Sequence, residues 1–463
     1  MSHFDLLVIG SGPAGARAAE DAAEAGLSTA LAESGFLGGT CLNTGCIPTK
    51  FLLGGTRLFP ALAAQKKYAT FSGEIFCDLP ALQARKDRFV KGSRGGLEKR
   101  LAEKGVTLFR GKAVFSGAHS VSLGTADGEK NLSFARCILA AGSVPASFPG
   151  LKPDGRSVLS SAGLLNLKEA PESLLIVGAG AIGLELGEFF HRLGSKIILV
   201  EGLPQILPAE DSDVSEVLRR YLLRQGWRIY TGRRIASVTT VDGSARLVFE
   251  SGEELTASLS LLAVGRRPNT AGLGAEAAGL ALRANGSLET DETLRCAEHI
   301  YAVGDCNGRA LLAHAADHQA RYAAAHAAGL VRAAYAPPDV PACVYGSMEV
   351  MRVGPTQKEL ARNGETPELS RAMLAENAMA QSLGQTEGFV KMLWSAARLR
   401  SICAVGHGVS RLAGAAALLV EKAPRRKEPL PIIFAHPTLD EILESAMVNA
   451  AESGAQSHQA GGF

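Results

Sequence analysis

The sequence lacks several features that mark other classes of protein. Its 48 Lys and Arg residues are balanced by 46 Asp and Glu residues, so the formal charge is only +2 and offers no basic field for nucleic acid. No apolar run approaches the ~20 residues that cross a bilayer, and the N-terminal stretch MSHFDLLVIG enters a strand pattern without the parts of a signal peptide. We therefore predict a cytoplasmic protein with small ligands and with no membrane or nucleic-acid partner.

Cysteine is scarce as well. The chain has 8 cysteines in 463 residues, and most of them are scattered singly, as expected for buried thiols in a reducing compartment. Only Cys41 and Cys46 form a local pair, in the stretch GGTCLNTGCIPTK. This pair has three interpretations to be weighed: a metal site, a structural disulfide or a redox pair.

A glycine fingerprint is present in the first residues. The stretch FDLLVIGSGPAGARAA passes from an apolar strand pattern through Gly10, Gly12 and Gly15 into an alanine-rich helical stretch. Glu33 ends the next predicted strand, 23 positions after Gly10. Such glycines let the backbone approach a pyrophosphate at a helix N-terminus, while the carboxylate accepts hydrogen bonds from ribose hydroxyls.

The same fingerprint occurs a second time. SLLIVGAGAIGLELGEFF contains Gly178, Gly180 and Gly183, and Glu201 again follows the first glycine by 23 positions. One such motif is weak evidence, but two in matching contexts predict two bound dinucleotides. The Glu201 carboxylate would repel a 2′-phosphate, so we predict NAD rather than NADP at the second site.

Three later stretches place glycines or an acid after a predicted strand. RCILAAGSVP and LSLLAVGRRPN lead to Gly142 and Gly265, where the chain is expected to complete each nucleotide-binding unit. HIYAVGDCNG places Asp305 at a strand's end, where a carboxylate suits a polyol ligand at the carboxyl edge of a parallel sheet. The alternative is that Asp305 only shapes a turn.

The cysteine pair is best explained by redox exchange. Zinc would require a second pair or closely spaced histidines, and a structural disulfide would be unusual in the cytoplasm and would close too short a loop to stabilise much. Positions five apart in a regular helix are separated by ~8.7 Å, beyond the ~7 Å that a disulfide tolerates. The first turn must therefore be distorted, which Gly45 and Pro48 permit. A thiolate near a helix N-terminus has a lowered pKa and is poised for exchange.

In these motifs the chain resembles the class I pyridine nucleotide-disulfide oxidoreductases, and most of all their dihydrolipoamide dehydrogenase branch. The resemblance is carried by GGTCLNTGCIPTK, GAGAIGLELGEFF, VGRRPNT, YAVGDC and AHPTLDE and runs over nearly the whole chain. It implies FAD at the first fingerprint and NAD at the second. It also implies that Glu33 contacts the FAD ribose and that Asp305 lies near its ribityl-phosphate region.

The resemblance also assigns roles around the redox pair. Cys41 would exchange with the substrate and Cys46 would face the flavin, with Lys50 near the flavin ring and paired with Glu185. From the sequence alone, Lys50 could equally be an ordinary solvated lysine.

Near the C-terminal end, the resemblance makes His436 the catalytic base and Glu441 its carboxylate partner, acting on the disulfide of the neighbouring subunit. Histidine suits proton transfer near neutral pH, and a carboxylate fixes its tautomer. The alternative for Glu441 is structural, because Thr438 to Glu441 reads as a capping box before a helical stretch. Three further histidines, His314, His318 and His326, are interpreted as structural.

The C-terminal portion departs from the family pattern. Gly346 and Met348 stand where the family usually has Thr and Pro, and Pro429 and Pro431 restrict the backbone just before His436. These departures concern the choice of substrate rather than the fold.

The predicted fold is α/β, with two doubly wound Rossmann-like nucleotide-binding domains and a C-terminal α+β dimerisation domain. The expected boundaries are 1–148 and 269–336 for the discontinuous FAD domain, 149–268 for the NAD domain and 337–463 for the interface domain. The predicted function is NAD-linked oxidation of a protein-bound dihydrolipoyl group by a homodimer. The partner would be a lipoyl-bearing protein of a 2-oxo acid dehydrogenase or glycine-cleavage system. Alternatives are an NAD(P)H-dependent reductase of another disulfide or thiol acceptor, and a redox-inert flavoprotein scaffold.

Overall fold

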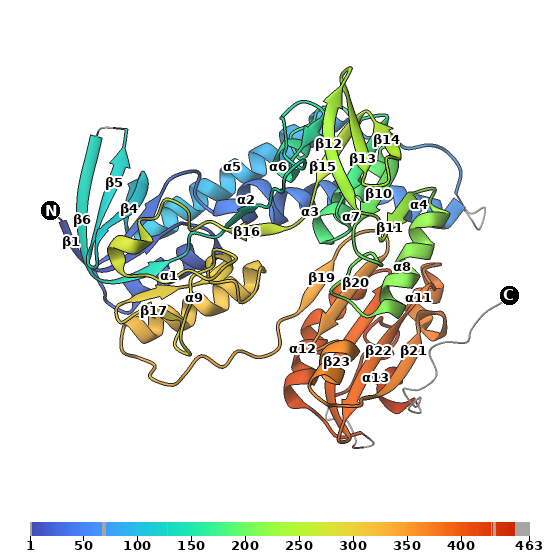
Figure 1. Cartoon of the computed structure of the whole chain (residues 1–463). Helices are drawn as coiled ribbons and strands as arrows, with labels where there is room; N and C mark the ends of the chain where they lie inside the picture. Colours follow the sequence, from blue (N-terminus) through green and yellow to red (C-terminus); the bar gives the residue numbers. More distant parts are fainter. Residues whose placement is uncertain (1, 67–70, 127, 427, 429–431, 450–463) are drawn as a thin grey trace. The chain divides into compact units, whose positions relative to one another are not determined.

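The computed structural model describes residues 2–66, 71–126, 128–426, 428 and 432–449. The chain divides into two units, each with its own sheets (Figure 1). Unit 1 comprises Met1–Phe51, Pro80–Ser147 and Val264–Pro337, and unit 2 comprises Leu52–Leu79, Phe148–Ala263 and Pro338–Phe463. The domain boundaries expected from the sequence stay a prediction.

Unit 1 is built on a mainly parallel sheet whose strand order is β17, β18, β6, β1, β2, β3. Strand β1 lies between β6 and β2 in this sheet. Its consecutive residues Leu6, Leu7 and Val8 are fully buried, which is typical of a strand covered on both faces. Two further strands, β5 and β4, continue from β6 in antiparallel pairing. The strands are β1 (Ser2–Ile9), β2 (Thr29–Glu33), β3 (Thr107–Arg110), β4 (Lys112–Gly117), β5 (Ser120–Thr125), β6 (Gly128–Leu139), β17 (Arg295–Ala297) and β18 (Ile300–Ala302).

Two alanine-rich helices, α1 (Pro13–Glu24) and α9 (Ala313–Ala327), pack against each other beside this sheet (Figure 1). Their small side chains, among them Ala18 and Ala320, share one buried cluster with Leu6 and Val8 of β1. The remaining elements of unit 1 are α2 (Gly39–Thr44), the first part of α3 (Cys46–Gly55), α5 (Leu79–Glu103), β7 (Ser143–Pro145), β16 (Arg266–Pro268), η1 (Ala275–Ala278) and η2 (Gly304–Asn307).

Unit 2 contains a second parallel sheet, in the order β11, β10, β9, β15, β8. Its strands are β8 (Val158–Leu159), β9 (Ser173–Val177), β10 (Lys196–Glu201), β11 (Arg228–Thr231) and β15 (Leu259–Leu262). A separate antiparallel sheet is formed by β12 (Ile235–Val241), β13 (Ser244–Phe249) and β14 (Glu254–Ala257). The helices of this part are α4 (Leu58–Lys66), α6 (Ser161–Leu164), α7 (Ala181–Arg192) and α8 (Ser212–Arg224).

The C-terminal part of unit 2 has an antiparallel sheet in the order β19, β20, β23, β22, β21. Its strands are β19 (Ala342–Val344), β20 (Glu349–Val353), β21 (Glu368–Met373), β22 (Gly388–Ser395) and β23 (Arg398–Gly406). Helices α12 (Ala413–Lys422) and α13 (Glu441–Val448) share its apolar cluster with Trp394 and Met392. The shorter elements are α10 (Gln357–Arg362), α11 (Ala378–Ser382), η3 (Leu374–Glu376) and η4 (Val409–Leu412). The predicted α/β fold class with a C-terminal α+β part is confirmed.

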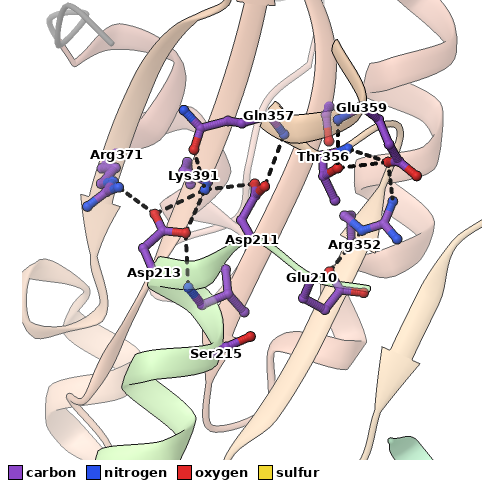
Figure 2. Close-up of polar contacts among 12 residues, drawn as sticks. Glu210, Asp211, Asp213, Ser215, Arg352, Thr356, Gln357, Glu359, Arg371 and Lys391 are labelled. Carbon is purple, nitrogen blue, oxygen red and sulfur yellow. Dashed lines mark hydrogen bonds and ion pairs between the residues drawn. The ribbon is translucent and has the colours of Figure 1, made fainter. Parts of the chain in front are cut away.

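A buried lysine joins α8 to the C-terminal sheet (Figure 2). Lys391 of β22 has no exposed surface, and its Nζ lies 2.9 Å from Asp211 Oδ2 and 2.8 Å from Asp213 Oδ1. Asp211 directly precedes α8 without capping it through its side chain, and Gln357 Oε1 accepts a further bond from the same Nζ. Burial alone would lower the pKa of Lys391, but its interactions with Cys403, Asp213 and Asp211 outweigh it and raise that pKa.

Within the described part of the chain, no helix combines the length and the apolar character needed to span a bilayer.

Candidate active site

The first glycine turn leaves open space where a ligand could approach the backbone. A Cβ at Gly15 would lie 1.7 Å from the Gly10 carbonyl oxygen, and Gly10 itself has a φ of +96°. Both positions therefore require glycine. A Cβ at Gly12, in contrast, would meet no protein atom within 4 Å. The turn is thus closed on the helix side and open at Gly12, as a pyrophosphate cradle must be.

Glu33 is fastened to this turn from the end of β2. Its Oε2 accepts hydrogen bonds from the Ser11 amide at 2.8 Å and the Ser11 hydroxyl at 2.6 Å, and its Oε1 accepts one from the Gly35 amide at 2.7 Å. The carboxylate is half-buried and retains lone pairs for further donors. It is therefore placed beside the open face of the turn, where the sequence predicts a ribose.

The second turn repeats this geometry. Gly178 has a φ of +102°, a Cβ at Gly183 would lie 2.1 Å from the Gly178 oxygen, and a Cβ at Gly180 would meet nothing within 4 Å. Glu201 accepts hydrogen bonds from the Ala179 amide at 2.8 Å and from the Leu203 amide at 2.9 Å. The residues present therefore fit a dinucleotide at each turn.

Cys41 of the cysteine pair shares a pocket with the first turn. This pocket has a volume of about 210 Å³ and is lined by Gly12 and Gly38 of the glycine loops, by Cys41 and by the apolar side chains of Ile47 and Leu97. Cys41 of the predicted redox pair is thus adjacent to the predicted FAD site within unit 1.

The two cysteines lie on separate short helices. Helix α2 ends at Thr44, and α3 begins at Cys46, because Gly45 between them has a φ of −140° and a ψ of −117°. The distortion expected at Gly45 is confirmed. Both cysteines are in the thiol form. A hydrogen bond with Cys46, followed by burial, raises the pKa of the Cys41 thiol, while the nearby Lys50 ammonium opposes this.

Asp305 lies in η2, directly after β18, which pairs in parallel with β6. Its carboxylate accepts a hydrogen bond from the Ser143 hydroxyl, and Arg266 Nε donates to the same hydroxyl at 2.7 Å. Arg266 also donates to the Ser143 carbonyl oxygen at 2.6 Å. Asp305 is therefore more than a turn former, since it ends a relay of polar groups.

Sequence reasoning missed Ser143 and Arg266. Each directly follows one of the predicted glycines, Gly142 and Gly265, which have φ values of +70° and +109°. The antiparallel pairing of β7 with β16 brings these two segments together. The sequence signal that could have identified Ser143 and Arg266 is that each is the polar residue immediately after a predicted glycine.

Lys50 and Glu185 belong to different units, so their pairing stays a prediction. Glu185 is buried on α7, and its Oε1 accepts a hydrogen bond from the Tyr345 amide at 3.2 Å.

His436 and Glu441 are in direct contact in unit 2. His436 Nδ1 lies 2.8 Å from Glu441 Oε1, and the other carboxylate oxygen accepts the Thr438 amide at 2.8 Å. These two bonds, that of Thr438 first, lower the pKa of Glu441. Glu441 thus contacts both the His436 ring and the Thr438 amide. The predicted capping box is wrong about the Thr438 hydroxyl, which does not cap the helix. The Thr438 hydroxyl donates to the Ala435 oxygen, and α13 begins after Asp440.

The remaining predicted positions are three histidines of one helix and two prolines near the C-terminal end. His314, His318 and His326 lie on α9, where His318 contacts the Tyr335 hydroxyl at 3.0 Å and His326 the Tyr301 hydroxyl at 2.8 Å. Among the residues that the structure describes, no three His, Cys, Asp or Glu side chains gather as a metal site would require. Pro429 and Pro431 lie outside the described residues.

Comparison with known families agrees with this geometry. Residues 4–320 match the pyridine nucleotide-disulphide oxidoreductase family, and residues 340–447 match the dimerisation domain of the same family. The chain belongs to this family, and it is an oxidoreductase whose cofactors are FAD and NAD.

Individual relatives show which members of this family the chain is similar to. The chain is 36% identical to a dihydrolipoyl dehydrogenase of Chlorobaculum tepidum over 98% of both chains. Among solved structures, it is similar to LpdA from Mycobacterium tuberculosis with a TM-score of 0.88 and 27% identity, covering 96% of this chain and 99% of that one. The flavoprotein disulfide reductase RclA from Escherichia coli has a TM-score of 0.83 and 26% identity over 96% of this chain and 99% of its own.

Proposed function

We propose that the protein oxidises the dihydrolipoyl group of a carrier protein and passes the electrons to NAD through a Cys41–Cys46 disulfide. The observation that carries this proposal is that Cys41 lines the same pocket as the first glycine turn, with Cys46 at the start of the next helix. Relatives of matching length that are named dihydrolipoyl dehydrogenase favour the dithiol substrate.

The cofactors would be held by the two glycine turns. FAD would lie along Gly12 with Glu33 and Asp305 as acceptors for its hydroxyl groups, and NAD would lie along Gly180 with Glu201 on its ribose. FAD, when bound, supplies a two-electron carrier between the thiols and NAD. The carboxylate of Glu201 disfavours a 2′-phosphate, so NAD is the proposed partner rather than NADP.

The thiol chemistry belongs to the chain itself. One substrate thiolate attacks the Cys41 sulfur, a substrate–Cys41 disulfide forms, and the Cys41–Cys46 bond breaks. The second substrate thiol then displaces Cys41, so the substrate leaves as a disulfide and the enzyme retains two electrons as its dithiol. In this dithiol the raised pKa of Cys41 keeps its proton on that sulfur, which leaves Cys46 as the acceptor of its hydrogen bond.

His436 is the proposed base for the substrate dithiol. Because Glu441 accepts a hydrogen bond at Nδ1, the other ring nitrogen, Nε2, is the one that takes the proton. We propose that this nitrogen serves the disulfide of the second subunit of a homodimer, since residues 340–447 match a dimerisation domain. A cytoplasmic 2-oxo acid dehydrogenase or glycine-cleavage system would supply the lipoyl-bearing partner.

A reductase of another disulfide and a redox-inert scaffold are not favoured, because relatives that are 35–36% identical over nearly the whole chain are dihydrolipoyl dehydrogenases. The test is steady-state NADH formation from dihydrolipoamide and NAD by the purified protein. We expect turnover by the natural chain, none by Cys46→Ser, and slow turnover by His436→Gln. Reduction of other disulfides with no oxidation of dihydrolipoamide would contradict the proposal.

A further inference from the structure

The loop that departs most from the family pattern lies against the helix of the second glycine turn. This loop, Tyr345–Met348, joins β19 to β20. The Tyr345 amide donates to Glu185, and the Ser347 hydroxyl donates to Glu188 Oε1. A Cβ at Gly346 would come within 3.2 Å of the Met348 oxygen and 3.6 Å of Glu188 Cγ. The contact with Glu188 would be an ordinary one, so the approach of the loop to α7 is held by its hydrogen bonds to Glu185 and Glu188.

Arg192 connects this loop to a third segment. Its Nε lies 2.9 Å from Glu188 Oε1, and its Nη2 donates to the Ser347 hydroxyl at 3.2 Å. Its Nη1 donates to the Leu53 carbonyl at 3.0 Å and to the Thr56 hydroxyl at 3.3 Å. The guanidinium therefore binds the C-terminal end of α3, where the helix dipole favours a cation. Helix α3 is the one that begins with Cys46 and carries Lys50.

The contacts lie on one side of α7. Glu185, Glu188 and Arg192 are spaced three and four residues apart, so they follow one face of the helix. The side chains of Glu188 and Arg192 are only 7% and 6% exposed, so their ion pair is held away from water and is costly to break. The face that presents Glu185 is thus fixed by two neighbours, the end of α3 and the atypical loop.

We propose that Arg192 is a positioning residue for electron exchange with NAD, because it fixes the redox helix and the Tyr345–Met348 loop to the face of α7 that carries Glu185. This inference rests on the proposed function only in taking α7 as the helix of the NAD site. Arg192 acts through Glu185 and α3 and touches no reacting atom. Arg192 contacts the C-terminal end of α3, whereas Cys41 lies on the separate helix α2. We therefore expect the loss of Arg192 to affect the NAD side of the reaction far more than the attack of the dithiol on Cys41.

The test separates the two sides of the reaction. Transfer of electrons from NADH to 3-acetylpyridine adenine dinucleotide involves no dithiol, whereas anaerobic reduction of the enzyme by dihydrolipoamide involves no nicotinamide. We expect Arg192→Met to slow the first about tenfold and to change the second by less than about twofold. The matched control is Arg220→Met, which removes an exposed ion pair with Glu216 on α8 and leaves both rates unchanged.

Hydrogen exchange gives a readout that is independent of activity. In Arg192→Met, the amides of residues 53–56 should exchange faster than in the natural protein, while those of α8 stay the same. Because Arg192→Met leaves Glu188 buried without its cation, Arg192→Met/Glu188→Gln and Ser347→Ala are measured beside it and should change both readouts in the same direction.

Equal slowing of both reactions, or unchanged exchange at residues 53–56, would overturn the inference. Transhydrogenation that responds as expected in a protein that does not oxidise dihydrolipoamide would instead refute the proposed substrate and leave the role of Arg192 standing.

Discussion

The two glycine turns have nearly the same backbone but are anchored differently. At the first turn, Arg17 of α1 is 31% exposed and contacts Asp317 at 3.0 Å. At the second turn, buried charges hold the helices, with Arg192 on Glu188 of α7 and Lys391 on Asp211 at the start of α8. The backbone geometry of the turn, which suits a dinucleotide, is nearly the same in both copies. The surroundings differ. The Arg17 ion pair beside the first turn is partly exposed, whereas the ion pairs of Arg192 and Lys391 beside the second turn are buried next to the C-terminal part of unit 2.

The largest expected effect comes from closing a turn. Gly15→Ala places a Cβ 1.7 Å from the Gly10 oxygen, and Gly183→Ala places one 2.1 Å from the Gly178 oxygen, so the backbone must shift in each case. We expect a loss of about 4 kcal/mol or more in the free energy of unfolding, measured by urea denaturation. FAD retention should fail in Gly15→Ala, whereas Gly183→Ala should lose NAD binding first. Full flavin content in Gly15→Ala would show that the turn is softer than its geometry implies.

The buried anchor should matter more than the exposed one. Lys391→Met leaves the Asp211 and Asp213 carboxylates without their cation and should lower the free energy of unfolding by about 3–5 kcal/mol at pH 7. Arg17→Met should cost about 1 kcal/mol or less, because its ion pairs are partly exposed. Similar losses in urea denaturation would remove the contrast between the two turns.

The Lys391 contribution has a defined pH dependence. The pKa of Lys391 is raised above its ordinary value of 10.5, so the folded state holds the proton more tightly than the unfolded chain. Its stabilisation is therefore fully present below pH 10.5 and is lost as the pH rises through the folded pKa. The difference between the natural protein and Lys391→Met should shrink above that pH, and a difference that grew with pH would contradict the assigned charges.

Several of these features could be predicted from the sequence, because they depend on local backbone geometry. Glycine spacing, the acidic residue at the end of the next strand and the break at Gly45 are all determined within a few tens of residues. The relay from Arg266 through Ser143 depends on the pairing of β7 with β16 across 123 positions, and Lys391 meets Asp211 across 180. No periodicity in the sequence shows such contacts, because they depend on how distant segments pack.

Local patterns also had competing solutions. Thr438 and Glu441 have the spacing of a capping box. The Thr438 hydroxyl instead donates to the Ala435 oxygen, and Asp440 is the residue directly before α13. The contact of His436 with Glu441 uses the remaining carboxylate oxygen. The residue types at this site were therefore predictable, whereas the division of their hydrogen bonds was not.

A smaller effect is expected where the turns are open. Gly12→Ala and Gly180→Ala add a methyl group that meets no protein atom within 4 Å, so neither should change the melting temperature of the protein freed of cofactors. Gly12→Ala should weaken FAD binding, and Gly180→Ala should raise the KM for NAD about tenfold, equivalent to ~1.4 kcal/mol. A melting temperature that fell in both variants would mean that the open space is needed for folding rather than for ligands.

The smallest expected effect concerns the choice of nicotinamide. Glu201→Arg replaces an acceptor for ribose hydroxyls by a cation that suits a 2′-phosphate, so the preference for NAD over NADP in kcat/KM should fall. Because Glu201 also accepts the Ala179 and Leu203 amides, some loss with both cofactors should accompany the change. An unchanged ratio would show that another residue contacts the ribose.

The central claim is that a dithiol reduces the Cys41–Cys46 pair and that the electrons reach NAD. The most direct measurement is an anaerobic titration of the flavin-loaded protein with dihydrolipoamide, followed by NAD. We predict a long-wavelength absorption band, characteristic of a thiolate beside the flavin, and then stoichiometric NADH with loss of the band. No band with dihydrolipoamide, or turnover only with NADPH and another disulfide, would contradict the account.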